Sequence, residues 1–272
     1  MKKYFVVSDV HGFYDEMKKA LDDAGFDKNN KDHIFVSCGD IFDRGDKPLE
    51  CLKFVNSLSK KRKILVRGNH EYLIEECLLR RKGLSHDMSN GTCRTIELLS
   101  GMSLKDYRFC DMCSEVIHNN KDYNKYMKSL VDFAEIGDYI VVHGWIPTKD
   151  LFCSYFACDR SDYDKNWRKG DWSQACWSDG GEKWRQGIIE PNKTIICGHW
   201  HVSDYHKYYH KEMIDHPWDI EDHYNLGIIS EYEYKEQMFQ STRPFIDNGI
   251  VALDACTVSS HRVNCYTFEV DE

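Results

Sequence analysis

The sequence is poor in the features that mark membrane, secreted and fibrous proteins. None of its apolar runs approaches the ~18 residues that a membrane-spanning helix needs, so we expect no membrane partner. The amino-terminal run Tyr4–Val7 is short and meets Asp9 without a small-residue cleavage site, which is unlike a signal peptide. Only 5 prolines and 17 glycines occur in 272 residues, and no repeat or low-complexity tract is present, which argues against a disordered or fibrous chain.

The sequence also has fewer basic than acidic residues. The chain has 36 Lys and Arg against 45 Asp and Glu, for a net charge of -9. An acidic surface repels polyphosphates, so we do not expect nonspecific nucleic-acid binding. A site for a phosphorylated substrate on this chain would need metal ions or local arginines to offset the negative field.

The 12 cysteines lack the spacing of a disulfide framework or a zinc finger. Cys110 and Cys113 form a lone C-x-x-C with no second pair at zinc-finger distance, and the other cysteines scatter through expected strands and helices. In a chain of this length without an export signal, we expect reduced, mostly buried thiols and a cytoplasmic location.

Short β-rich runs recur along the chain, and most end in a polar cluster. The first five are continuous apolar runs, typical of strands covered on both faces, and amphipathic helices expected at 15–24 and 48–57 alternate with them. This alternation predicts an α/β fold with parallel strands and right-handed crossovers. We expect strands at Tyr4–Ser8, His33–Ser37, Lys63–Arg67, Tyr139–Val142, Thr194–Cys197, Ile250–Leu253 and Asn264–Val270, the last two forming an antiparallel hairpin that turns at Ser259 and Ser260.

Three segments interrupt this rhythm, at about 72–136, 150–192 and 203–247. The first is mostly helical in pattern, and the other two are rich in Trp, Tyr, His and charged residues. No linker separates a second unit. We therefore expect a single domain, 1–272, with insertions beside the carboxyl edge of the sheet, where substrate contacts commonly lie.

Each of the first five predicted strands leads into a polar motif flanked by glycine. In open α/β sheets ligands bind outside the carboxyl ends of the strands, so five strands of one sheet would bring these motifs to the same edge. Each motif alone is weak evidence, but five of them at five strand ends make coincidence remote. They are Asp9-x-His11, Gly39-Asp40-x-x-Asp43-Arg44-Gly45, Gly68-Asn69-His70-Glu71, His143-Gly144 and Gly198-His199-x-His201.

The donors in these motifs are carboxylates, imidazoles and an amide, without thiolate. This mixture suits first-row ions, while the imidazoles disfavour magnesium or calcium, whose ligands are oxygens. The donors are too many for one ion and indicate two divalent metals about 3.5–4 Å apart, an arrangement found in phosphatases. We expect Mn2+ as the cofactor, with Fe, Zn or Ni as alternatives.

The five motifs resemble those of the calcineurin-like metallophosphoesterase superfamily. Their extensions at Asp43-Arg44-Gly45 and His70-Glu71 resemble its phosphoprotein phosphatase branch, which includes bacterial serine/threonine protein phosphatases and diadenosine tetraphosphatases. Asp254 and the hairpin expected around it resemble the closing strands of the family. The resemblance implies a metallophosphoesterase fold, a four-layer αββα sandwich of two mixed sheets flanked by helices. Ser8, Trp145 and the second histidine His201 depart from the pattern of the phosphatase branch.

The resemblance also implies a role for each matching residue. The expected metal ligands are Asp9, His11 and His201 for the first ion, Asp40 as the bridge, and Asn69, His143 and His199 for the second. His70 is expected to protonate the leaving group as general acid. Asp43 would orient His70 through a hydrogen bond, since a carboxylate partner fixes the tautomer of an imidazole. Arg44 would bind phosphate oxygens, because a guanidinium matches their geometry.

Further substrate contacts are less defined by the sequence. Arg67 and Arg94 are candidates for phosphate binding, although a structural or solvated arginine explains both equally well. The histidines at 206, 210, 216 and 223 match no closed ligand set, so we expect them on an exposed lid. The tryptophans at 167, 172, 177, 184 and 200 could stack on a nucleobase or a peptide, but we expect most to pack in a core.

Three functions fit this sequence. The first is a two-metal phosphoesterase acting on phosphate monoesters, similar to a serine/threonine protein phosphatase, with a phosphoprotein as partner. The second is a hydrolase of a dinucleoside polyphosphate such as diadenosine tetraphosphate, or of an RNA cap, with a nucleotide as partner. The third is a non-catalytic homologue that binds metal, which is disfavoured because every ligand position and the expected acid are filled.

Overall fold

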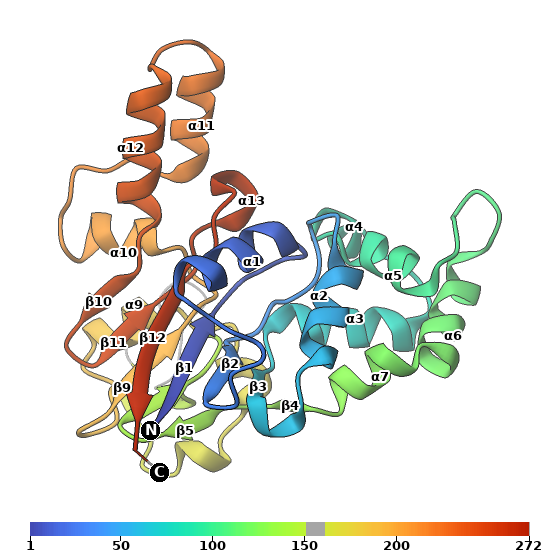
Figure 1. The fold of residues 1–272 in the computed structure, drawn as a ribbon, viewed down its shortest axis with the longest axis horizontal. Coiled ribbons are helices and arrows are strands. Elements are labelled where there is room, and N and C mark those ends of the chain that lie inside the picture. Colours follow the sequence, from blue (N-terminus) through green and yellow to red (C-terminus); the bar gives the residue numbers. More distant parts are fainter. Residues whose placement is uncertain (151–160, 272) are drawn as a thin grey trace.

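The computed structural model describes residues 1–150 and 161–271, and its centre is a pair of five-stranded sheets (Figure 1). The first sheet has the order β12-β1-β2-β3-β4, in which only β12 is antiparallel to its neighbour. Its strands are β1 (Lys2–Val7), β2 (His33–Ser37), β3 (Lys63–Val66), β4 (Leu130–Val131) and β12 (Cys265–Val270).

The second sheet has the order β10-β11-β9-β6-β5, with parallel pairing in its centre and antiparallel pairing at both edges. Its strands are β5 (Ala134–Ile136), β6 (Tyr139–Val141), β9 (Thr194–Cys197), β10 (Phe245–Asp247) and β11 (Ile250–Ala252). Both sheets are therefore mixed. A separate two-stranded ladder joins β7 (Thr148–Asp150) to β8 (Ser161–Tyr163).

Alternation along the strands divides the apolar side chains between two layers. Tyr4 and Val6 of β1 belong to a buried cluster that also contains Val141, Ile196 and Val251 of the second sheet, so this cluster lies between the sheets. The intervening residues Phe5 and Val7 belong to a different cluster on the helical side of the first sheet. This distribution follows from the two-residue period of a strand.

Helices cover the outer faces of both sheets, which confirms the expected four-layer αββα class. The outer face of the first sheet packs against α1 (Tyr14–Asp23), α2 (Pro48–Ser57), α3 (Asn69–Arg80), α5 (Thr92–Ser100), α6 (Phe109–Asn119) and α7 (Lys121–Met127). The second sheet shares its outer core with Trp145, Trp167 and Tyr205. The remaining helical elements are η1 (Lys60–Arg62), α4 (Ser85–Ser89), η2 (Trp167–Lys169), α8 (Trp172–Ala175), α9 (Gly180–Arg185), α10 (Val202–Tyr208), α11 (Pro217–Asn225), α12 (Glu231–Thr242) and α13 (Thr257–Ser260).

Two expectations about strand pairing are wrong. The five motif-bearing strands do not share one sheet, since β1, β2 and β3 lie in the first sheet and β6 and β9 in the second. The expected carboxy-terminal hairpin is also absent among the described residues: β11 pairs with β9 and β10, whereas β12 pairs with β1. Ser259 and Ser260 lie in the short helix α13, which gives the chain enough length to cross from one sheet to the other.

The segments expected as insertions contribute distinct elements. Residues 72–136 contain most of α3, all of α4 to α7 and the short strands β4 and β5. Residues 203–247 contain most of α10 and all of α11, α12 and β10, and the pair α11–α12 projects from the body of the molecule (Figure 1). The expected segment 150–192 lies partly outside the described residues. The division of the chain into one domain stays a prediction.

No helix in the described ranges combines the length and the apolar character needed to cross a bilayer.

Candidate metal centre

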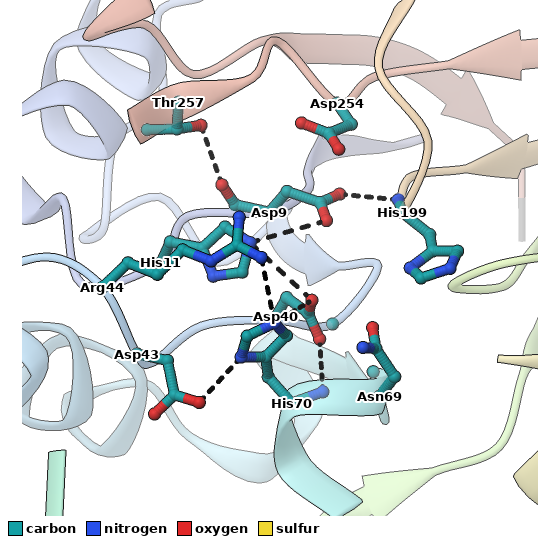
Figure 2. A network of polar contacts seen from close by, with 12 residues as sticks. Asp9, His11, Asp40, Asp43, Arg44, Asn69, His70, His199, Asp254 and Thr257 are labelled. Atoms are coloured by element: carbon teal, nitrogen blue, oxygen red, sulfur yellow. Dashed lines mark hydrogen bonds and ion pairs between the residues drawn. The ribbon is translucent and has the colours of Figure 1, made fainter. Parts of the chain in front are cut away.

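Residues of four motifs lie together at the carboxyl ends of strands from both sheets (Figure 2). His143 of the remaining motif joins them, with its Nε2 3.5 Å from Oδ1 of Asp40. Their side chains sit on sharply turned backbone, because six of these polar residues have positive φ values of 50° to 69°. Non-glycine residues adopt this left-handed region rarely, and such strain gathers at functional sites. The six are Asp9, His11, Asp40, Asp43, Arg44 and His199.

Two motif glycines are required because the neighbouring carboxylates come too close for any side chain. A Cβ atom on Gly68 would lie 2.0 Å from Oδ1 of Asp40. A Cβ atom on Gly198 would lie 2.1 Å from Oδ2 of Asp9. The backbone at both positions thus forms part of the wall around a buried carboxylate.

Asp40 lies between the imidazoles that come from different sheets. Its Oδ1 is 3.5 Å from Nε2 of His143, and its Oδ2 is 3.8 Å from Nε2 of His11. The backbone N–H of His70 donates to Oδ1 at 3.0 Å and fixes the carboxylate in this orientation. Asp40 therefore offers one oxygen to each side of the site, as a bridging ligand requires.

The tautomers of His11 and His143 follow from their backbone partners. Nδ1 of His143 is 2.9 Å from the carbonyl of Cys38, and Nδ1 of His11 is 3.1 Å from the carbonyl of Phe42. A carbonyl only accepts, so each Nδ1 carries the proton and each Nε2 presents a lone pair. For His143 that lone pair faces Oδ1 of Asn69 at 2.7 Å, so two acceptor atoms point at one another.

The lowered pKa values of His11 and His199 favour the neutral imidazole, which is the form that binds a metal ion. Burial lowers the pKa of His199 to about 2 and, together with the charge of His70, holds the pKa of His11 well below its ordinary value. Burial also raises the pKa of Asp40 and of Asp254, and in Asp254 the charge of Asp9 adds to this effect. A bound cation would remove the repulsion between the facing lone pairs and between the crowded buried carboxylates. The residues present therefore fit a pair of divalent metals.

His70 and Asp43 form a buried pair beside the metal-ligand candidates. Nδ1 of His70 is 2.7 Å from Oδ2 of Asp43, and the hydroxyl of Thr92 donates to the same oxygen at 2.7 Å. Burial lowers the pKa of His70, but the carboxylates of Asp40 and Asp43 outweigh it, so the net shift is upward. Nη2 of Arg44 lies 3.4 Å from the other ring nitrogen of His70, at the exposed side of the site.

Glu71 organises the loop that carries Asp40. It is completely buried, and its carboxylate accepts hydrogen bonds from the backbone of Asp40, Ile41 and Gly68 and from the hydroxyl of Tyr126, at 2.8 to 3.0 Å. Four donors satisfy the buried charge and join the β2–α2 loop to the start of α3. The sequence marked Glu71 only as part of a motif and did not predict this function.

A family profile described as calcineurin-like phosphoesterase matches residues 2–212. The chain belongs to this family. The expectation drawn from the five motifs is therefore confirmed.

Curated relatives of this chain include two kinds of dinucleoside tetraphosphatase. The symmetrical bis(5'-nucleosyl)-tetraphosphatase of Pasteurella multocida is 43% identical over 75 residues, which is 27% of this chain and 26% of that protein. The asymmetrical bis(5'-nucleosyl)-tetraphosphatase PrpE of Bacillus velezensis is 29% identical over 157 residues, or 54% of this chain and 58% of that protein. The matched stretches thus span from about a quarter to less than two thirds of these relatives.

A solved structure shares the fold of this chain. The cold-active protein tyrosine phosphatase of a psychrophilic Shewanella species superimposes with a TM-score of 0.51 at 17% identity. The superposition covers 99% of this chain and 76% of that enzyme. At this level of identity the likeness concerns the fold alone.

Among the described residues, the hydrogen bonds and ion pairs of Arg67 and Arg94 are made with glutamates and not with the metal-ligand candidates. Arg67 binds Glu75 at 2.7 Å and stacks on Tyr72, and Arg94 binds Glu97 at 2.7 Å on an exposed surface. Their binding of phosphate stays a prediction.

The histidine-rich insertion departs from its expected exposure. His206 and His216 are only 3% and 7% exposed, so an exposed lid is the wrong description for both. Nε2 of His216, the residue before α11, lies 3.1 Å from Nδ1 of His201 and so orients that expected ligand. Nothing in the sequence spacing linked His216 to His201.

Among the tryptophans, Trp167 is fully buried and Trp172 and Trp184 pack against the core, as expected for most of them.

Proposed function

We propose that this chain is a two-metal phosphoesterase that hydrolyses phosphate monoesters in the manner of a serine/threonine protein phosphatase. The observation that carries the proposal is the position of Asp40, buried between His11 and His143 with one oxygen toward each. Family membership supports the same chemistry. A phosphorylated protein or nucleotide would be the partner, and the cytoplasm the location.

Seven residues would hold the two ions, for which manganese is the first choice. Asp9, His11, Asp40 and His201 would hold one, and Asp40, Asn69, His143 and His199 the other. Divalent ions bound here would neutralise charge on the phosphate and lower the pKa of an attacking water. The protein supplies neutral imidazoles and buried carboxylates fixed by hydrogen bonds, which orients the ligands before an ion arrives.

The remaining polar groups would serve the substrate. His70, held by Asp43, would give its proton to the departing oxygen, and its upward-shifted pKa favours the protonated form required for that step. Arg44, an exposed residue beside His70, would bind phosphate oxygens through its paired N–H groups.

A second candidate is hydrolysis of a dinucleoside polyphosphate, favoured by three tryptophans around the site. Trp177, Trp200 and Trp218 are 41% to 47% exposed. Trp177 and Trp200 lie 5.9 and 6.3 Å from the ring of His199, and Trp218 lies 5.6 Å from the ring of His201. Exposed aromatic rings beside the metal ligands suit a nucleobase, which stacks on them.

A substrate panel with manganese would test both candidates. We expect hydrolysis of an aryl phosphate in either case, and the ranking of kcat/KM for a phosphopeptide, diadenosine tetraphosphate and capped RNA distinguishes them. If the tryptophans bind a base, Trp200→Ala should raise KM for diadenosine tetraphosphate about tenfold, from the loss of one stacking contact, and leave the aryl phosphate unaffected. No metal-dependent hydrolysis of any of the four compounds would refute the proposed function.

A further inference from the structure

A second group of metal-binding side chains lies at the end of α10. His206 is in the last turns of this helix, and His210 and Glu212 follow directly after it. Nδ1 of His206 and Nδ1 of His210 lie 3.3 and 3.6 Å from the same atom, Oε1 of Glu212. The three donor atoms lie within 4.8 Å of one another, and none of the three residues belongs to the phosphoesterase site.

The hydrogen bonds of the two histidines leave both Nδ1 atoms without a proton. Nε2 of His206 lies 3.1 Å from the carbonyl of Arg243, and Nε2 of His210 lies 3.0 Å from Oδ2 of Asp247. Both partners accept, so in a neutral imidazole the proton is on Nε2 and the lone pair is on Nδ1. These lone pairs then point toward an acidic oxygen, which repels them.

The strongest indication of a metal site is His206, because this residue is almost completely buried. Its exposed fraction is 3%, and its Nδ1 atom has no hydrogen-bond partner. A buried acceptor without a partner costs free energy.

The distances fit a tetrahedral ion. Donors bound about 2.0–2.2 Å from zinc in a regular tetrahedron are separated by about 3.4 Å, close to the two separations from Glu212. Both histidines already have the outer partner, a backbone carbonyl or a carboxylate, that ligating imidazoles usually have. Phe245 is fully buried and lies 5.4 and 4.4 Å from the rings of His206 and His210, which fixes their orientation.

The charge of the group also suits a cation. Arg243 pairs with Oε2 of Glu212 at 2.5 Å, which leaves Oε1 free for the ion. Arg243 opposes a metal by its own charge, but Glu212 and Asp247 together outweigh it. His210 and Glu212 have about a third of their side chains exposed, so the ion and a water as fourth ligand can enter from solvent.

We propose that His206, His210 and Glu212 form an additional binding site for a zinc-like divalent ion, separate from the paired-metal centre. Such an ion would fix the end of α10 against β10, because its two histidine ligands hydrogen-bond to Arg243, just before β10, and to Asp247, at the end of β10. Since α10 begins immediately after His201, the site would steady the element that carries an expected ligand of the metal centre. The inference stands independently of the reaction catalysed.

Zinc content of the full chain tests this proposal. The wild type and the variants His210→Gln and Glu212→Gln would be stripped with a chelator, loaded with zinc, dialysed and measured by elemental mass spectrometry, with folding checked by circular dichroism. His223→Gln is the matched control, since it removes a histidine of α11 outside the site. We expect each site variant to hold about one zinc per chain less than the wild type and the control, and to lose part of the rise in melting temperature caused by zinc.

Equal zinc content in the wild type and both site variants would overturn the proposal. Should the variants fail to fold, a zinc anomalous map of wild-type crystals decides the question without them. A peak within about 2.0–2.2 Å of the three donors supports the site. Zinc peaks confined to the paired-metal centre contradict it.

Discussion

His70 and Asp43, which we propose as the general acid and the residue that orients it, are held in place by several contacts at the scale of single residues. Their hydrogen bond is buried, and Thr92 fixes the acidic partner from a different helix. Asp43 itself has a left-handed backbone conformation, which costs about 1–3 kcal/mol and persists only where surrounding contacts hold it. The geometry of the pair thus depends on contacts from α3, α5 and the loop after β2.

Replacing His70 tests its role as general acid. We expect His70→Asn to lower turnover by about 10²–10⁴ on a phosphate ester with a poor leaving group, the usual contribution of general acid catalysis. An ester with a good leaving group should lose less, because its departing oxygen needs no proton. The measurement is kcat for both substrates, with metal content to confirm that the site is intact.

His118→Asn is a suitable control, since His118 is exposed on α6. It should keep wild-type turnover. If His70→Asn also keeps wild-type turnover on the poor leaving group, another residue must supply the proton.

Asp40 is the residue on which both ions are expected to depend. Asp40→Asn removes the negative charge that lies between His11 and His143, so we expect metal occupancy to fall at both positions after manganese loading and dialysis. Asp46→Asn, in the exposed part of the same loop, should retain the metals. Two manganese ions per chain in Asp40→Asn would show that this carboxylate is not the bridge.

At the scale of elements, Glu71 is the main connection between the β2–α2 loop and α3. In Glu71→Gln, the side-chain NH2 group takes the place of one carboxylate oxygen. It then faces N–H and O–H donors that have lost their acceptor. We expect Glu71→Gln to lower the free energy of unfolding by about 3 kcal/mol, since each stranded buried donor costs about 1–3 kcal/mol. Urea denaturation measures this loss.

Glu76 offers a matched comparison on the same helix. Its side chain is 63% exposed, so Glu76→Gln should change stability by less than about 0.5 kcal/mol. Equal stabilities of the two variants would mean that the four hydrogen bonds to Glu71 contribute little.

The sequence predicted elements well where periodicity alone defines them. The expected helix 48–57 coincides with α2, and the predicted strand 194–197 coincides with β9. Pairing was not predictable in the same way, because an apolar run does not state which sheet it joins. The strands at 250 and 265 therefore looked like a hairpin, although twelve intervening positions, including α13, take the chain from one sheet to the other.

The sequence predicted those residues of the site that fall in short motifs. The carboxylates and imidazoles of these motifs do converge, although from two sheets rather than one. Contacts between residues far apart in the chain had no such signal. The hydrogen bond from Thr92 to Asp43 and the contact of His216 with His201 depend on how the helices pack, which no local pattern records.

At the scale of the whole molecule, the buried thiols lie in or against all three buried clusters and report on their packing. The ten cysteines described in the structure are free. Burial raises the pKa of Cys176 and Cys265 to about 12, and raises that of Cys38 and Cys197 as well. A raised thiol pKa means that the unreactive protonated form dominates at pH 7.5.

We therefore expect iodoacetamide to modify Cys38 and Cys197 slowly in the native chain and rapidly in guanidinium chloride. Peptide mass mapping without reductant should find no disulfide among the ten. Rapid native labelling of these two cysteines, or a disulfide-linked peptide from either, would contradict the packing described.

In the proposed metal centre, one cation lies on each side of the Asp40 carboxylate. Anomalous diffraction at the manganese edge, from crystals grown with Mn2+, would locate both ions. We expect two peaks about 3.5–4 Å apart, one beside Asp9 and His11 and the other beside Asn69 and His143. A single peak, or none within coordination distance of Asp40, would contradict this arrangement.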